Sequence, residues 1–346
     1  MYLYNSWYVA GWDYEFKNDL TTRLILEEDL VFYRNEDGTV VALENACTHR
    51  KLPLSYGKLI DDHIQCGYHG LEFSCDGACS KIPGQEEIPE KVKVKSYPTA
   101  EKWNWVWVWM GDPDLADESL IMDVPHFNDP GWGINCGPTM KIDCHYQVYT
   151  DNLLDPAHVT FVHPTTLAGK NKSGETVPIA VESSDKTVTA SRWTLNGDPA
   201  PLFELFHQYS DKVDRLQSYQ LHLPSLSVIS MICADAGTGA QEGQGDNRLA
   251  LNSYNFITPE TADSCRYYWF QTRDFLADKD DVSAKLTASF LGAFNEDKVI
   301  LEAVHQGMKY KKTPNINLAI DKASNKARRI LKSLIEAEQG RPDMDI

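Results

Sequence analysis

The chain carries Cys47-Thr48-His49-Arg50 and Cys66-Gly67-Tyr68-His69, with sixteen residues between His49 and Cys66, and these two stretches are its most informative feature. Each stretch supplies one cysteine and one histidine. Thiolates and imidazoles are common ligands of iron and zinc. The two stretches are therefore interpreted as the two halves of one metal site.

A Rieske [2Fe–2S] cluster uses this ligand set, with two cysteines on one iron and two histidines on the other. The alternative is structural zinc, which Cys2His2 sets also bind. Zinc fingers usually place both cysteines in one half and both histidines in the other, whereas each half here has one of each. The pattern favours a cluster held by Cys47, His49, Cys66 and His69, and with it a role in electron transfer.

A second ligand pattern lies about ninety residues downstream, where His158 and His163 are five residues apart. Residues five apart on an α-helix differ by about 140° of rotation. The two side chains can meet on one ion only if the helix bends or ends near His163, and Pro164 favours an end there. Two histidines plus one carboxylate form the facial triad of non-haem Fe(II) oxygenases.

The third ligand of this site must come from elsewhere in the chain. Asp297 is the favoured candidate and its neighbour Glu296 is the alternative. Alternatively, His158 and His163 could simply end a helix and bind no metal. The presence of a predicted Rieske cluster in the same chain favours the iron site.

Two polar residues precede His158 and are candidates for supporting roles. Asp155 lies one helical turn earlier, where its carboxylate could accept a hydrogen bond from a metal-bound imidazole. It could equally cap a helix that begins at Pro156. Asn152 is expected either to line the iron site or to pack beside it.

The composition narrows the classes of function. The 346 residues exceed what one core usually organises, which predicts two domains. A net charge of −17 argues against a nucleic-acid partner. No signal peptide and no apolar run of membrane-spanning length is apparent, so we expect a cytoplasmic protein. The eight cysteines then suit iron–sulfur chemistry better than disulfides.

The order of predicted elements indicates an α+β chain. Residues 1–115 are expected to form an all-β cluster domain and residues 116–346 a catalytic domain, with a turn-rich, acidic boundary near 111–118. In the second part we expect helices at 151–162, 281–305 and 319–339. Strands are expected at 187–193, 218–223, 227–233, 250–257 and 265–272.

With both sites in view, the whole chain resembles the oxygenase (alpha) subunits of Rieske non-haem iron oxygenases. The resemblance rests on the four cluster ligands, on Ile82-Pro83-Gly84-Gln85, on Asp151 through His163, and on Glu296-Asp297-Lys298-Val299. It is greatest for the short, alpha-only branch that includes vanillate O-demethylase, toluenesulfonate methyl-monooxygenase and dicamba O-demethylase. One departure is Lys51, since many members have a small residue, often glycine, at that position.

The resemblance implies a helix-grip catalytic domain, in which an antiparallel sheet is combined with helices. It also implies a head-to-tail homotrimer in which the cluster of one subunit faces the mononuclear iron of the next, with the residue matching Asp155 between them. It further implies a separate flavin/[2Fe–2S] reductase or a ferredoxin, because we find no dinucleotide or flavin motif in the chain.

The predicted activity is a monooxygenase that uses O2 and NADH-derived electrons to oxidise a methyl or methoxy group of an aromatic acid. The alternative within the enzymes is cis-dihydroxylation of an aromatic ring. A Rieske electron carrier, or a ligand-binding protein with a structural metal, are the alternatives outside them. Four residues are candidates for the substrate pocket, although the aromatic ones among them could simply belong to the core. They are Asn255, Trp269, Phe290 and Phe294. Arg266 and Arg273 are considered for an anionic substrate, with surface salt bridges as their alternative role.

Overall fold

The computed structural model describes residues 2–163, 167 and 177–340. The chain divides into two compact units. The first comprises Met1–Asp123 together with Thr258–Ala262, and the second comprises Val124–Ile257 and Asp263–Ile346. Each unit is described by itself.

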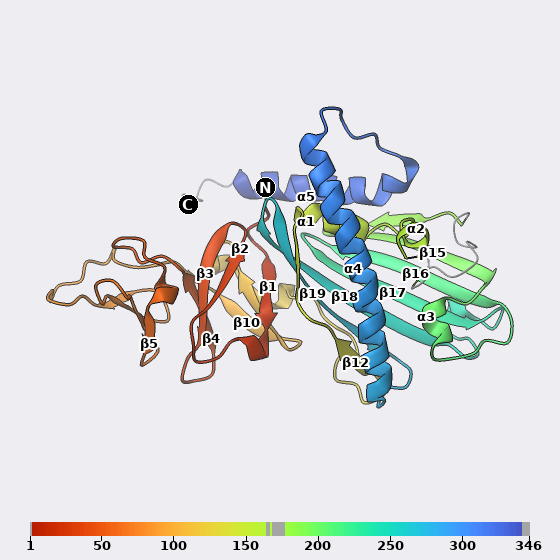
Figure 1. The fold of residues 1–346 in the computed structure, drawn as a ribbon, viewed down its shortest axis with the longest axis horizontal. Coiled ribbons are helices and arrows are strands. Elements are labelled where there is room, and N and C mark those ends of the chain that lie inside the picture. The colour runs from red at the N-terminus through yellow and green to blue at the C-terminus, as the bar shows by residue number, and fades with distance from the viewer. Residues whose placement is uncertain (1, 164–166, 168–176, 341–346) are drawn as a thin grey trace. The chain divides into compact units, whose positions relative to one another are not determined.

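The first unit is built from short antiparallel strands and 3-10 turns. Its sheets have the orders β1-β11-β10, β2-β3-β4-β9 and β5-β6-β7-β8 (Figure 1). The strands are β1 (Trp7–Trp12), β2 (Thr21–Ile25), β3 (Glu28–Arg34), β4 (Val40–Glu44), β5 (Lys58–Ile60), β6 (His63–Gln65), β7 (Glu72–Phe73), β8 (Cys79–Lys81), β9 (Ser96–Tyr97), β10 (Thr99–Lys102) and β11 (Trp105–Trp109).

The strands β1 and β11 of the first unit carry many large side chains and are buried on both faces. Every residue of β11, which alternates tryptophan and valine, is buried. β1 pairs with β11 along its length and is also fully buried. The cluster cysteines belong to a separate core with side chains of β3, β4, β6 and β7.

The second unit contains one large twisted sheet, eight-stranded in the described part of the chain, with the order β12-β19-β18-β17-β16-β15-β14 and β13 paired to β19. The strands are β12 (Gly133–Cys136), β13 (Met140–Ile142), β14 (Ala180–Ser183), β15 (Thr187–Gly197), β16 (Val213–His222), β17 (Leu226–Asp235), β18 (Leu249–Thr261) and β19 (Ser264–Arg273). The helices are α1 (Tyr146–Asn152), α2 (Val159–Val162), α3 (Pro201–Glu204), α4 (Asp280–Tyr310) and α5 (Lys322–Gln339).

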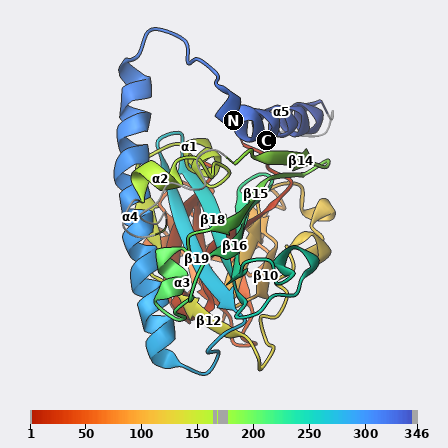
Figure 2. The ribbon, with the colours of Figure 1, turned by 90° about the vertical axis from the view of Figure 1, so that its right-hand side faces the viewer.

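One long helix, α4, runs across a face of this sheet (Figure 1). Its buried residues recur every three or four positions, as expected for a helix with one face on a core. They are Val282, Leu286, Phe290, Ala293, Phe294, Asp297, Leu301 and His305. A single carboxylate, Asp297, thus occupies a position in an otherwise mostly apolar stripe. Helix α5 packs instead against β14 and β15 (Figure 2).

The predicted fold class is confirmed: an all-β N-terminal part is followed by an antiparallel sheet combined with helices. The prediction of one continuous helix over 151–162 is wrong, because the structure has two short helices there. Helix α1 ends at Asn152 and α2 begins only at Val159. Asp155 interrupts the helix because its Oδ1 accepts a hydrogen bond from the Ala157 N–H at 2.7 Å, a turn that competes with helical pairing. Pro164, the expected helix end, lies outside the described residues.

Within the described residues, no helix combines the length and the apolar composition that crossing a bilayer requires.

Candidate cluster site and metal centre

The two cysteine–histidine stretches form loops of the same backbone design. The Cys47 N–H donates to the Leu52 carbonyl at 2.9 Å, and the Cys47 carbonyl accepts from Lys51 N–H at 2.8 Å. The second loop repeats this pattern. The Cys66 N–H donates to Leu71 at 2.7 Å, and the Cys66 carbonyl accepts from Gly70 N–H at 3.0 Å. The two loops therefore share their backbone hydrogen bonds around the cysteine, while the histidine follows two residues after Cys47 and three residues after Cys66.

The four side chains separate into a sulfur pair and an imidazole pair. Burial raises the pKa of the Cys47 thiol, and the neighbouring Cys66 thiol raises it further. The rings of His49 and His69 lie 4.6 Å apart between centroids. Among the described residues, these four do not supply three ligand atoms within 4.8 Å of one another, as ligands of a single ion would. The arrangement suits a two-iron cluster better than one zinc ion.

The two pairs differ in exposure. Both cysteines are buried in a core formed with residues such as Leu54 and Phe73, whereas both histidines are exposed. His49 and His69 line an open hollow whose wall includes Ile82 and Pro83. The two imidazoles therefore face solvent, while the two cysteine side chains are shielded from it.

The second ligand pattern converges in space. One ligand atom each from His158, His163 and Asp297 lies within 4.8 Å of the others. Nε2 of His158 and Nε2 of His163 lie 3.6 Å and 3.1 Å from the same oxygen, Oδ1 of Asp297. His158 and His163 flank the single turn of α2, while Asp297 comes from the middle of α4. Because the helical turn ends at Val162, the two imidazoles can turn toward a common point.

Glu296 lies on the other side of one histidine. Its Oε2 is 2.8 Å from Nδ1 of His163, the ring nitrogen that faces away from Asp297. A carboxylate in this position fixes the tautomer and orientation of a metal-binding imidazole. The structure thus separates the two acidic candidates: Asp297 faces both histidines and Glu296 supports one from behind.

The electrostatics show how a cation would fit. Burial lowers the pKa of His158 despite the attraction of Asp297 and Asp155. Burial also opposes protonation of His163, but Asp297 and Glu296 outweigh it and raise its pKa. Oδ1 of Asp297 is buried and, in the described structure, receives no hydrogen bond of normal geometry. A buried carboxylate oxygen without such a bond is costly, and a metal ion between the three side chains would satisfy it.

The supporting candidates lie just before α2. Oδ2 of Asp155 is 3.9 Å from Nδ1 of His158, so the carboxylate faces that ring without a hydrogen bond to it. Asn152 ends α1, and its Nδ2 is buried without a hydrogen-bond partner among the described atoms. Asp155 is therefore close to a predicted iron ligand, while the role of Asn152 stays a prediction.

Comparisons with known proteins find relatives for both parts of the chain. Residues 6–98 match the family model of the Rieske [2Fe-2S] domain, and residues 142–337 match that of the vanillate O-demethylase oxygenase C-terminal domain. The iron-sulfur subunit of the toluene-4-sulfonate monooxygenase system of Comamonas testosteroni is 37% identical and spans 98% of this chain and 99% of its own. A vanillate O-demethylase oxygenase subunit of Pseudomonas sp. (strain HR199 / DSM 7063) is 32% identical over 99% of this chain and 98% of its own.

The chain belongs to the Rieske oxygenase family. The solved structure of dicamba monooxygenase bound to dicamba has the same fold as this Rieske oxygenase, with a TM-score of 0.87 at 30% identity, covering 98% of this chain and 99% of the other. The predictions of the family, the enzyme class and the [2Fe–2S] cluster are confirmed by these similarities.

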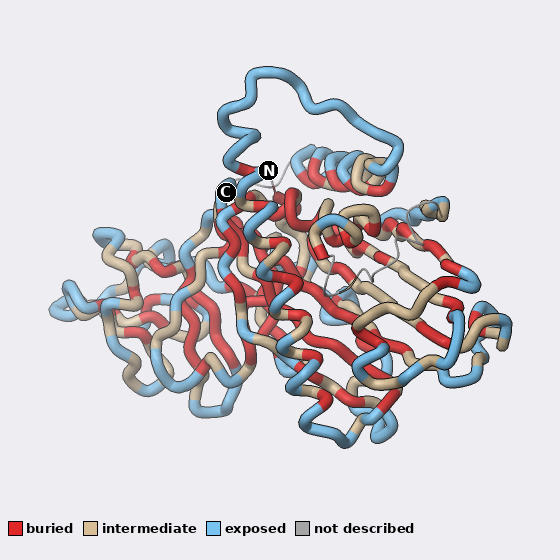
Figure 3. The backbone as a smooth tube through the Cα atoms, turned by 45° about the vertical axis from the view of Figure 1, so that its right-hand side comes forward, coloured by how far each residue is buried: buried red, intermediate tan, exposed pale blue. Residues whose placement is uncertain are grey.

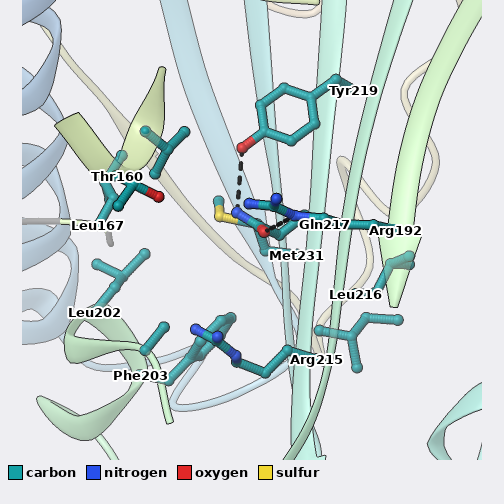
Figure 4. A pocket seen from close by; sticks show the side chains of 13 residues that line it. Thr160, Leu167, Arg192, Leu202, Phe203, Arg215, Leu216, Gln217, Tyr219 and Met231 are labelled. Atoms are coloured by element: carbon teal, nitrogen blue, oxygen red, sulfur yellow. Dashed lines mark hydrogen bonds between the residues drawn. The ribbon is translucent and has the colours of Figure 1, made fainter. Parts of the chain in front are cut away.

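A cavity lies beside the predicted iron site of this Rieske oxygenase. It is lined by Val159 and Thr160 of α2, by α3, and by strands β15 to β17 (Figure 4). The polar side chains on its sheet side are Arg192, Gln217 and Tyr219, with Arg215 further along β16. The cavity is the main candidate for a substrate-binding space next to the iron ligands.

The four residues predicted for the substrate pocket are not part of this cavity. Trp269, Phe290 and Phe294 pack on one another, with ring centroids 5.0 and 5.7 Å from Phe294, and are at most 4% exposed. Asn255 is fully buried, and its amide is saturated by Ser227, Ser253 and Tyr267. These side chains form the core between α4 and the sheet.

The arginines considered earlier also differ from those of the cavity. The guanidinium of Arg273 is buried and donates to the Leu276 and Lys279 carbonyls and to Ser283, before and within the first turn of α4. Arg192 and Arg215, which the sequence interpretation overlooked, line the cavity instead. The alternation of buried and less buried residues along β15 could have identified Arg192. The buried positions are Val188, Ala190, Arg192 and Thr194, so an arginine lies where apolar residues are expected.

Proposed function

We propose that this chain is the terminal oxygenase component of a monooxygenase system and oxidises a methyl or methoxy group of an aromatic acid. The observation that carries the proposal is the convergence of His158, His163 and Asp297 in a chain with a Rieske domain. The names of the relatives support the reaction class, since they include a toluene-4-sulfonate monooxygenase and O-demethylases of vanillate and dicamba.

The metal-binding residues are assigned as follows. Cys47 and Cys66 hold one iron of the cluster, and His49 and His69 hold the other. His158, His163 and Asp297 hold a mononuclear Fe(II), with Glu296 orienting His163. When bound, the cluster supplies electrons and the mononuclear iron supplies O2 activation. We place the Rieske domain at residues 1–115 and the catalytic domain at residues 116–346.

The protein itself would position the substrate and control access to the iron. Asp155 is proposed to lie between the cluster of one subunit and the iron of its neighbour, and Asn152 to support the iron site. Their closeness to His158 and to the end of α1 supports these roles. No direct substrate contact is proposed for the four core residues Asn255, Trp269, Phe290 and Phe294, which would only support the site from behind.

We further propose a head-to-tail homotrimer. The second half of α4 supports self-association, because exposed apolar side chains recur on one face at four-residue spacing. They are Ile300, Val304 and Met308, with Val299 beside them, at 46%, 45%, 42% and 68% exposure. The exposed end of α4 and the loop after it are visible in Figure 3. A second copy of the chain is the proposed occupant of this surface.

The electron donor is proposed to be a separate flavin/[2Fe–2S] reductase or a ferredoxin that draws on NADH. A cytoplasmic location is proposed as well. The exposed imidazoles of His49 and His69 support docking of a donor at the hollow they line. One turnover consumes one O2 and two electrons from NADH, and one oxygen atom leaves as water. Oxidation of a methoxy carbon then gives a phenol and formaldehyde, and oxidation of a ring methyl gives a benzylic alcohol.

The test is a product assay with purified protein, a surrogate flavin/[2Fe–2S] reductase and NADH. The panel contains methoxy- and methyl-substituted benzoates and benzenesulfonates. We expect formaldehyde or a hydroxymethyl product in proportion to the NADH consumed, and loss of both in Asp297→Ala. The cluster absorbance of that variant should be unchanged, which separates a lost iron site from a misfolded protein.

Other products would identify the alternatives. Dihydrodiols without formaldehyde would assign the chain to ring cis-dihydroxylation. Protein that contains both the cluster and the mononuclear iron could take up electrons without consuming O2. That result would identify the chain as an electron carrier. Either result overturns the proposal.

A further inference from the structure

The cavity beside α2 has an unusual lining for a space inside a sheet-and-helix core. Its volume is about 50 Å3, several times what one water molecule needs. Its apolar side includes Leu202, Phe203 and Met231. Its sheet side carries two arginines, and none of the described residues that line it is acidic.

The two arginines project from neighbouring strands on the same side of the sheet. In the antiparallel pairing of β15 with β16, Arg192 is opposite Gln217 and Arg215 is opposite Thr194. The two guanidinium-bearing residues are therefore diagonal neighbours, close enough for long side chains to approach one ligand. Figure 4 shows both side chains extending toward the residues of α2 and α3 that close the cavity.

Arg192 is held in place and is linked to the metal-binding segment. Its Nε donates to Oε1 of Gln217 at 2.8 Å, and one terminal nitrogen donates to the Pro156 carbonyl at 3.4 Å. Gln217 in turn donates to the hydroxyl of Tyr219 at 3.4 Å. Pro156 lies two residues before the ligand His158, so the arginine is positioned relative to the predicted iron.

The electrostatics of the cavity favour an anion. Burial lowers the pKa of Arg192. Burial also lowers the pKa of Arg215; the positive charge of Arg192 adds to this effect, while Cys233 and Asp198 oppose it. An anionic group between the two would offset both the desolvation and the mutual repulsion. Guanidinium groups bind carboxylate and sulfonate oxygens through charge-assisted hydrogen bonds.

We propose that Arg192 and Arg215 bind the anionic group of the aromatic substrate and thereby select organic acids over neutral aromatics. The inference rests on the proposed function for the identity of the site and adds the residues that recognise the charge. The shared ligand chemistry is an aromatic ring with a carboxylate or sulfonate group, while Leu202, Phe203 and Met231 contact its apolar part.

Binding without turnover tests this inference. Calorimetric titration of the iron-loaded protein, under nitrogen and without reductase, would use 4-methylbenzoate, 4-methoxybenzoate and 4-toluenesulfonate as anionic probes. The neutral probe is 4-methylanisole. We expect Arg215→Met and Arg192→Met each to weaken binding of the preferred anion by about 10- to 100-fold and to leave binding of the neutral probe unchanged.

Two further variants separate charge from structure. Arg215→Lys keeps the positive charge and should retain more anion affinity than Arg215→Met. Arg248→Met is the matched control, because Arg248 is a partly buried arginine of the same unit that pairs with Asp274 and does not line the cavity. It should bind the anions as the unchanged protein does. The carboxylate and sulfonate arms identify which anion is preferred.

Several results would overturn the inference. They are equal affinity of the unchanged protein for anionic and neutral probes, no binding of any anion, or full anion affinity in both methionine variants. Because no turnover is needed, anion binding through these arginines in a protein that forms no product would reject the proposed reaction alone. Product formation with unaffected arginine variants would reject this inference alone.

Discussion

At the scale of single residues, the two cluster loops have different residues at the equivalent positions 51 and 70. Lys51 and Gly70 both donate to the carbonyl of the preceding cysteine and both have positive φ, +59° and +72°. A side chain is disfavoured in this left-handed conformation, whereas glycine adopts it freely. The lysine that departs from the family pattern therefore carries local strain in the first loop.

Replacing Lys51 with glycine should relieve this strain and stabilise the cluster loop by up to about 1 kcal/mol. The reverse change, Gly70→Ala, should destabilise by about 1–2 kcal/mol, since its Cβ would also lie 3.2 Å from Cγ of Pro83. Loss of the exposed ion pair between Lys51 and Glu44 should matter little. The temperature at which the visible absorbance of the cluster is half lost measures both effects. A lower temperature for Lys51→Gly than for the unchanged protein would show that Lys51 does not strain the loop.

A second residue-scale expectation concerns the residue behind the metal ligand. Glu296→Ala removes the acceptor from Nδ1 of His163 and should weaken affinity for the mononuclear iron by about 10- to 100-fold. Glu296→Gln keeps an acceptor and should have a smaller effect. Chelator competition followed by iron analysis measures the affinity, with cluster absorbance as the control. Equal iron retention in all three proteins would show that Glu296 does not orient the ligand.

Individual residues also show what the sequence could predict. The sequence predicts the four cluster residues, the two histidines and either Asp297 or Glu296 as ligands, because ligand chemistry restricts residue type and spacing, and the structure brings His158, His163 and Asp297 together. Arg192 and Arg215 were missed. Arg215 fell outside the strand expected at 218–223, which in fact begins at Val213, so its inward register could not be read.

At the scale of elements, the interruption between α1 and α2 creates the metal centre. A continuous helix over 151–162 would direct His158 and His163 to different sides. The break at Asp155 and the single turn of α2 turn both imidazoles toward α4 instead. Periodicity predicts helices well where they are long, as in α4, but a short helix whose geometry is set by one side-chain hydrogen bond is beyond it.

Helix α1 should also make stability sensitive to acid. Its N-cap, His145, accepts from the Gln147 N–H, and burial together with the charges of His305 and Arg328 lowers the pKa of His145 to about 4, against the pull of Asp263. Between the unfolded value near 6.5 and 4, the unfolded chain binds a proton that the folded chain does not. Stability is therefore lost as pH falls through this range, by at most about 1.4 kcal/mol per pH unit.

His145→Asn keeps a capping acceptor and removes this titration. We expect the variant to lose less stability than the unchanged protein between pH 7 and pH 5, as measured by urea denaturation of the metal-free forms. His126→Asn, at an exposed position, serves as the control and should retain the original acid sensitivity. An unchanged pH dependence in His145→Asn would show that this imidazole is protonated equally in both states.

At the scale of the whole molecule, the exposed apolar residues on the second half of α4 bear on the proposed trimer. Apolar side chains at i, i+4 and i+8 in water usually mark a protein interface. The C-terminal helix offers a contrast: α5 buries Ala323, Ala327, Leu331 and Ile335. The apolar face of α5 is therefore buried, whereas part of the apolar face of α4 is exposed, which supports the proposed self-association.

Val304→Glu in this face should shift the protein from trimer toward monomer, because a carboxylate would be buried at the interface. Light scattering after size-exclusion chromatography gives the mass directly. Val299→Glu, on the neighbouring edge of the face, should have a weaker effect, and Lys332→Glu on α5 should have none. A monomeric unchanged protein, or a trimer that tolerates Val304→Glu, would contradict the assignment of this surface.

The first unit is discontinuous in sequence. The Leu26 and Glu27 N–H groups donate to the carbonyls of Pro259 and Glu260 at 3.0 and 2.8 Å, and the Thr258 hydroxyl donates to Val9 at 2.7 Å. During synthesis on the ribosome, these bonds can form only after more than two hundred further residues have been added to the N-terminal segment. Cluster insertion into a nascent N-terminal fragment would thus meet an incompletely closed unit, and biogenesis of this protein should favour cluster loading after the whole chain has been released.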